Sequence, residues 1–193
     1  MGTQSQSVEL IDSTTTVNIT RAALFAALMG AFAYVTFPSP ISPAPVTLQV
    51  LGVFLAGILL GPVWGGASMV LYLLAGALGA PVFAGGSAGF GPLLGATAGY
   101  LYSYPLAAAL IGAIVHRGRA VRSPTELGLP AMVGAMVAGT AVIYALGIAG
   151  LMLVLNLTVV EAFLQGAAAF IPVEAVKIAA AVGIVRSDAL TTQ

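Results

Sequence analysis

The sequence predicts an all-α integral membrane protein with six transmembrane helices, and its composition carries that prediction. Of the 193 residues 60% are hydrophobic and only 6% are charged, whereas soluble domains carry about a quarter charged residues. No Asp, Glu, Lys, Arg or His occurs over residues 22–115. At about 20 residues per crossing, the apolar sequence has room for about six helices. The absence of cysteine excludes disulfides and thiolate metal sites.

Prolines and glycines divide the apolar sequence into segments. We expect helices at 20–37, 47–60, 63–79, 93–116, 129–155 and 170–186. Residues 1–19 are polar and rich in Ser and Thr, which favours a disordered tail, and 187–193 form a short cytoplasmic tail. The transmembrane domain is therefore expected over residues 20–186.

The breaks between these helices have distinct compositions. Four prolines within residues 38–46 predict an ordered or extended loop at a membrane surface. Gly61 and Pro62 predict a tight turn, and residues 80–92 form a glycine-rich loop. The connector 156–170 has room for a short interfacial helix.

The arginines predict the orientation of the bundle. If the N-terminus is cytoplasmic, all of them fall on the cytoplasmic side, as the positive-inside rule requires: Arg21, Arg117, Arg119, Arg122 and Arg186. Both termini are then cytoplasmic, and the proline-rich and glycine-rich loops lie outside. The formal net charge is zero and no basic tract occurs, which argues against nucleic acid as a partner.

The last helix carries the leading candidate site. Lys177 is the only lysine, and Glu174 precedes it by three residues, so that both side chains lie on one helix face. A lysine at bilayer depth costs roughly 2.5–3.5 kcal/mol, and such residues usually face a cavity and mark a substrate or ion path. Lys177 lies about 7–8 Å below the outer end of its helix. A carboxylate accepts and an ammonium donates, so the pair suits a ligand with both N–H and carbonyl groups.

Further polar candidates lie at the same outer level. Gln49 stands at the start of the second helix and matches the depth of the acidic and basic pair. Thr97 and Tyr100 in the fourth helix are weaker candidates, because a tyrosine near a membrane interface usually has an anchoring role.

Catalysis by this chain is not expected. The segment GGSAG at 85–89 fits the pattern G-x-S-x-G around Ser87, but the only histidine, His116, is placed at the opposite membrane face. No G-x-x-x-x-G-K-[ST] segment occurs, so any ATPase that drives transport must be another polypeptide.

Small residues repeat every four positions along the first helix and allow close helix contacts. They form two adjacent rows, Ala22, Ala26, Gly30 and Ala23, Ala27, Ala31. Two rows suffice for one partner within the bundle and one outside it, although packing within the bundle alone also explains such glycines and alanines.

Four segments occur together in order: PVTLQVLGVFLAGILLG at 45–61, GAPVFAGGSAGFG at 79–91, GATAGYL at 95–101 and IPVEAVK at 171–177. As a set they resemble the BioY family, the biotin-specific substrate-binding (S) components of energy-coupling factor (ECF) transporters. The resemblance extends over about residues 21–186. The family commonly has G-P-T-G-G-Y and P-G-D-x-x-K, where this chain has Ala96, Ala98, Val173 and Glu174.

The resemblance implies a six-helix S-component fold in the cell membrane, with biotin as transported ligand and no cofactor. It further implies that Glu174 accepts from ureido N–H groups, that Lys177 donates to a ligand oxygen, and that Gln49, Gly85 and Gly86 complete the polar contacts. The small residues of the first helix, Ala22 and Ala26 among them, would dock the coupling subunit that bears two ATPase subunits. An ion-coupled secondary transporter of biotin or a related small vitamin, acting without ATPase partners, is the alternative.

Overall fold

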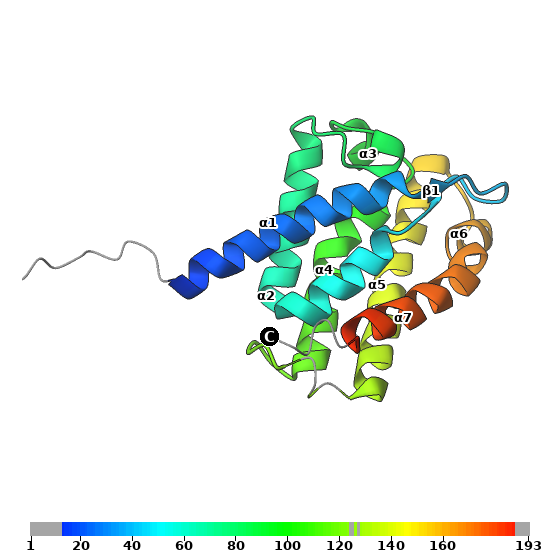
Figure 1. Ribbon diagram of the computed structural model, residues 1–193. Helices are drawn as coiled ribbons and strands as arrows, with labels where there is room; N and C mark the ends of the chain where they lie inside the picture. The colour runs from blue at the N-terminus through cyan, green and yellow to red at the C-terminus, as the bar shows by residue number, and fades with distance from the viewer. Residues whose placement is uncertain (1–12, 124–125, 127, 188–193) are drawn as a thin grey trace, which may run out of the picture.

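The computed structural model describes residues 13–123, 126 and 128–187, and in this part the chain is helical apart from loops and two short strands (Figure 1). Its elements are α1 (Ser13–Tyr34), β1 (Thr36–Phe37), β2 (Val46–Thr47), α2 (Gln49–Ala77), η1 (Ala84–Gly86), α3 (Gly91–Leu94), α4 (Ala98–His116), α5 (Leu129–Leu155), α6 (Val159–Gly166), η3 (Ala168–Phe170) and α7 (Ile171–Val185). Five of the described helical segments are long and apolar enough to cross a membrane. The expected tails over 1–12 and 188–193 lie outside the described residues.

Helix α2 is folded back on itself at Gly61, which has φ 74° and is followed by Pro62. Gln49 Nε2 donates a hydrogen bond to the Tyr72 hydroxyl, 23 residues further along the chain. In a straight helix these residues would be about 34 Å apart. The limbs 49–60 and 62–77 therefore run side by side, and the two short helices and tight turn expected from the sequence are confirmed. With α1, α4, α5 and α7 they make the expected six-helix bundle.

Helix α1 begins at Ser13, seven residues before the expected start, so part of the expected tail is helical. The Thr20 hydroxyl donates to the Thr16 carbonyl, a bond within the helix that lets a threonine-rich segment continue it. The helix ends at Tyr34, three residues early, because Thr36 and Phe37 form an antiparallel strand pair with Val46 and Thr47. The proline-rich segment is thus the loop of a short β-hairpin, which the sequence analysis did not specify.

The expected fourth helix is interrupted near its start. Gly95 has an extended backbone (ψ −171°), which separates α3 from α4. The fifth helix matches its expected bounds, and α6 is the short helix for which the connector had room. Helix α6 begins with a capping box in which the Thr158 and Glu161 side chains each bond the backbone of the other.

The packing places α2 and α4 at the centre of the bundle. Helix α2 packs against α1, α4 and α7, and α4 also packs against α5. The outer helices expose apolar side chains, among them Leu24, Leu153 and Val176, as expected of surfaces that face lipid. The β-hairpin, α3 and α6 gather at one end of the bundle, at the upper right of Figure 1. The loops at this end enclose the candidate site.

Candidate ligand-binding site

The centre of the candidate site is an ion pair on the first two turns of α7. Lys177 Nζ lies 2.8 Å from Glu174 Oε1, and the two residues are only 4% and 5% exposed. Pro172 near the helix N-terminus fits a first turn whose N–H groups have no helical partners. The three-residue spacing then brings both side chains to the inner face. The pairing expected from the sequence is present, and it is directed into the bundle.

A cavity of about 70 Å³ adjoins this pair. It lies beneath the loops, between the first turns of α2, α4 and α7 and the middle of α5. Its lining residues are Ala44, Pro45, Val46, Thr47, Gln49, Val50, Phe83, Ala84, Ser87, Pro92, Thr97, Tyr100, Leu101, Tyr104, Ile143, Tyr144, Phe170, Glu174 and Lys177. Most of the wall is apolar or aromatic, and the polar groups are few. Such a composition suits a small molecule with one polar end or edge.

Gln49 lines the cavity but its amide is already engaged. Its Oε1 accepts from the Thr47 hydroxyl at 3.0 Å, and its Nε2 donates to the Tyr72 hydroxyl. The amide therefore joins the two limbs of α2 at the level of the site. Tyr72 is fully buried and makes an edge-to-face contact with Phe83, with 5.5 Å between ring centroids. This network holds one wall of the cavity.

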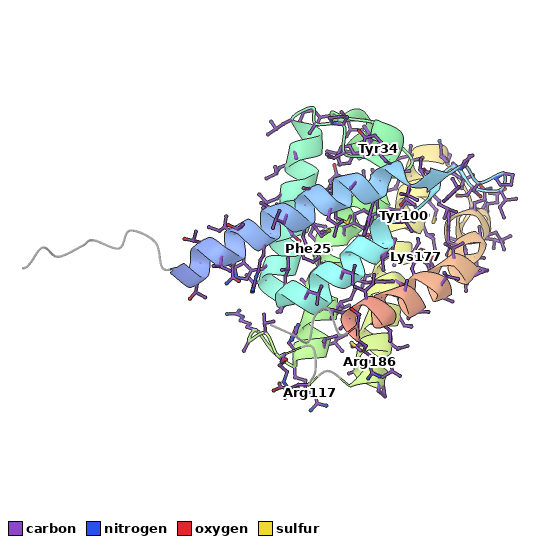
Figure 2. All side chains as sticks on the ribbon, viewed as in Figure 1. Phe25, Tyr34, Tyr100, Arg117, Lys177 and Arg186 are labelled. Atoms are coloured by element: carbon purple, nitrogen blue, oxygen red, sulfur yellow. The ribbon has the colours of Figure 1, made fainter. Side chains whose placement is uncertain are left out.

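Tyr100 and Thr97 also line the cavity, from α4 and the residue before it. The Tyr100 hydroxyl donates to the Gly166 carbonyl at 2.7 Å, so its ring forms cavity wall while its polar group ties α4 to α6. Tyr100 and Lys177 lie within the bundle, whereas Arg117 and Arg186 lie at the end where α4 and α7 finish (Figure 2).

Gly85 and Gly86 do not line the cavity, whereas their neighbours Ala84 and Ser87 do. Both glycines have positive φ, 66° and 79°, and so form the turn that places Ala84 and Ser87 at the cavity. The Tyr34 ring packs over Gly86, and the Tyr34 hydroxyl donates to the Pro81 carbonyl. The glycine-rich loop is thereby fixed to the end of α1.

Tyr144 on α5 is a site residue that the sequence analysis missed. Its buried hydroxyl interacts with the Glu174 carboxylate, but neither this hydroxyl nor Glu174 Oε2 makes a hydrogen bond of regular geometry, and both residues line the cavity. Buried polar groups normally have well-formed hydrogen bonds. The Tyr144 hydroxyl and Glu174 Oε2 therefore mark where a ligand can form hydrogen bonds. No sequence signal separates Tyr144 from the tyrosines that serve as membrane anchors.

The structure keeps Ser87 and His116 apart. The Ser87 hydroxyl donates to the Ala84 carbonyl. The His116 ring bridges the Ile58 carbonyl and the Arg122 amide at the opposite end of α4. The nucleophile and base of a serine hydrolase are therefore not assembled from these residues.

The two small-residue rows of α1 lie on different sides of the helix. Ala22 and Gly30 are buried, and Gly30 lies close to the side chain of Val82. Ala23 and Ala27 are exposed, while Ala26 is half-buried. The first row thus packs within the bundle and the second faces outward.

These features define the class: a membrane-spanning helical bundle with an internal polar site suited to a small ligand. A model of the BioY family matches residues 4–191, and the chain belongs to that family. It is 44% identical to the biotin transporter BioY of Rhodobacter capsulatus over 140 residues, 72% of this chain and 71% of that one. It is 39% identical over 160 residues to a probable biotin transporter BioY of Pyrococcus horikoshii, 83% of this chain and 88% of that one.

The fold is also similar to that of a solved structure. This is the crystal structure of the S-component for biotin from an ECF-type ABC transporter, with a TM-score of 0.81 and 25% sequence identity. The similarity covers 91% of this chain and 93% of that one.

Proposed function

We propose that this protein is the biotin-binding S component of an ECF-type importer and takes part in biotin uptake across the cytoplasmic membrane. Family membership and the names of its relatives support biotin as the ligand. The observation that carries the proposal is the buried Glu174–Lys177 pair beside a cavity, with Glu174 Oε2 making no hydrogen bond of regular geometry.

The pair fits the polar chemistry of biotin. Glu174 Oε2 is available to accept a ureido N–H, while Lys177 can donate a further N–H to a ligand oxygen without releasing Glu174. Hydrogen bonds to charged groups are the strong ones, with net values of about 1.5–3 kcal/mol. The aromatic and apolar walls then suit the thiophane ring and the valeryl chain. In the empty protein the two charges neutralise each other.

In this proposal, other subunits carry out the ATP hydrolysis that drives transport. The chain has no phosphate-binding loop, so ATP hydrolysis requires two ATPase subunits joined through a transmembrane coupling subunit. The outward row containing Ala23 and Ala27 supplies a surface of small side chains for that subunit. Ala22 and Gly30 act within the bundle instead, because they are buried there.

The proposed cycle begins with capture of biotin from the outer side. Five arginines on the cytoplasmic side under the proposed topology place the cavity and its loops outside. The loops close over the ligand, and the bundle reorients for release inside when the partner subunits hydrolyse ATP. The near absence of charge on the lipid-facing surface lowers the cost of such a reorientation.

Two measurements test this function. Equilibrium binding of labelled biotin to the purified chain is expected to be saturable and competed by unlabelled biotin. Liposomes that contain only this chain are expected to bind biotin without ATP-driven uptake, and added coupling and ATPase subunits should confer such uptake. Uptake by the chain alone under an imposed proton or sodium gradient would favour the ion-coupled alternative. An absence of biotin binding would overturn the proposal altogether.

A further inference from the structure

A second cleft lies at the opposite end of the bundle from the biotin cavity. Its volume is about 360 Å³, and it is formed by the start of α1, the reversal of α2 and the α4–α5 connector. The lining residues are Thr14, Asn18, Arg21, Leu59, Leu60, Trp64, Arg119 and Val121. Polar and cationic groups thus share the cleft with leucine, valine and tryptophan side chains.

The charge in this cleft is unbalanced. Arg21 and Arg119 both line it, and none of its lining residues is acidic. Within the part of the chain that the structure describes, neither guanidinium makes an ion pair, because the Lys177–Glu174 contact is the only salt bridge there. Guanidinium groups bind phosphate oxygens through paired N–H donors. Two of them beside Thr14 and Asn18 make a site for a phosphate group.

The connector that carries Arg119 is packed against α2. His116 Nδ1 accepts the Arg122 backbone N–H at 2.9 Å, so its Nε2 carries the proton and donates to the Ile58 carbonyl at 2.8 Å. This bridge fixes the connector against the first limb of α2. A methyl group on Gly61 would lie 2.7 Å from Val121 Cγ2, so the connector also packs directly on the α2 reversal. Arg119 is therefore carried on an anchored loop.

The cleft lies at the ends of membrane-spanning helices, where lipid headgroups are found. Arg21 follows the first turns of α1, and Trp64 follows the α2 reversal. A half-buried tryptophan at such a level is typical of the membrane interface. Basic pockets between transmembrane helices bind anionic headgroups at this depth. The leucines of the cleft can meet the glycerol and upper acyl chain.

We propose that this cleft binds the phosphate of an anionic phospholipid, with Arg21 and Arg119 on the phosphate and Trp64 beside the acyl chain. The site is separate from the biotin cavity and does not depend on the proposed transport function. Two arginines near the surface correspond to about a tenfold preference for anionic over zwitterionic headgroups, allowing for solvent exposure.

Trp64 provides the readout, because it is the only tryptophan in the chain. The full-length protein is reconstituted into bilayers of fixed composition, with phosphatidylglycerol and phosphatidylcholine in constant proportion. A bromine label that quenches tryptophan is placed on the acyl chain of one lipid or of the other. Surface charge is then identical in the two arms, and only the headgroup beside Trp64 differs. We expect labelled phosphatidylglycerol to quench Trp64 at least about twice as strongly.

Variants assign the preference to the cleft. The double variant Arg21→Gln/Arg119→Gln should bring the ratio of the two quenching signals to about one. The matched control Arg117→Gln/Arg186→Gln removes two arginines that do not line the cleft, and it should retain the preference. Both double variants should bind biotin as the unaltered chain does, which shows that they are folded.

Three results would overturn the proposal. The first is equal quenching by both labelled lipids in the unaltered protein, and the second is a preference that survives in Arg21→Gln/Arg119→Gln. The third is loss of the preference in millimolar inorganic phosphate at matched ionic strength, which would assign the cleft to a soluble phosphate compound instead of a lipid.

Discussion

Burying the charges of Glu174 and Lys177 costs free energy, and the same charges allow the pair to bind a polar ligand. Moving two charges out of water is expensive, and their mutual attraction offsets this only when the remaining donors and acceptors are satisfied. Here one carboxylate oxygen bonds Lys177, and the other makes no hydrogen bond of regular geometry although the Tyr144 hydroxyl interacts with the carboxylate. The empty site is therefore incompletely satisfied, and a ligand with an N–H at that position gains what the protein lacks.

Tyr144 provides the first residue-scale prediction. Tyr144→Phe removes a buried hydroxyl that interacts with Glu174 without forming a hydrogen bond of regular geometry. We expect the thermal stability of the ligand-free protein to change little, and biotin affinity to fall about 2- to 13-fold, since a neutral hydrogen bond contributes about 0.5–1.5 kcal/mol. Isothermal titration and thermal unfolding in detergent measure the two effects.

Tyr100→Phe is the matched control for that substitution. The Tyr100 hydroxyl already donates to the Gly166 carbonyl, so its removal leaves a buried acceptor unpaired. Stability of the ligand-free protein should fall by about 1–3 kcal/mol. If Tyr144→Phe behaved like Tyr100→Phe and lost stability without losing affinity, Tyr144 would be a packing residue only.

The sequence identifies some site residues better than others. Glu174 and Lys177 can be found because charge is rare in apolar sequence and costly in a bilayer. Tyr144 cannot, since its role depends on which neighbours leave its hydroxyl unpaired, and that is a property of the packed bundle. A ligand contact through the Gly85 backbone stays a prediction; the structure gives Gly85 a positive φ in the turn whose residues Ala84 and Ser87 line the cavity.

At the scale of elements, the crossing of α4 and α5 sets the position of the Tyr100 ring. A methyl group on Gly99 would overlap the Leu146 carbonyl, and one on Gly147 would overlap the Tyr100 ring. The two helices thus approach through glycines, as is common where membrane helices pack closely.

Gly99→Ala is therefore expected to push α5 away from α4. Overpacking of this kind costs about 1–3 kcal/mol. Both thermal stability and biotin affinity should fall, because α5 carries Tyr144 into the cavity. The matched control is Gly134→Ala on α5, where an added methyl group meets nothing within 4 Å. Equal behaviour of the two variants in thermal unfolding would contradict the close crossing.

Helix boundaries could be predicted where the chain carries a clear break. The Gly61–Pro62 reversal followed from a residue that adopts positive φ next to one that lacks an N–H. The early start of α1 was missed because Ser and Thr favour both polar tails and hydrogen bonds within a helix. The break before α4 was missed because one extended glycine, Gly95, is not distinguishable from a helical one in sequence.

At the scale of the whole molecule, orientation in the membrane is the property with the widest consequences. It decides from which side the cavity fills and which leaflet meets the arginine-lined cleft. The prediction rests on five arginines that fall on one side, and it follows the positive-inside rule.

The chain has no cysteine, so single cysteines report its orientation without background. Ser39→Cys lies in the β1–β2 loop, and Ala120→Cys lies in the α4–α5 connector. In intact cells a membrane-impermeant maleimide should label Ser39→Cys, while Ala120→Cys should react only after permeabilisation. The reverse pattern would invert the topology and place the biotin cavity on the inner side.

Binding of biotin to Lys177→Met and Glu174→Gln is the most direct test of the central claim, that the buried ion pair binds the ligand. Each variant loses a charge-assisted hydrogen bond to biotin that contributes about 1.5–3 kcal/mol, so the dissociation constant for biotin should rise about 10- to 150-fold. The exposed Glu126→Gln should bind as the unaltered chain does. Unchanged affinity in both site variants would contradict the account of the site while leaving membership of the BioY family intact.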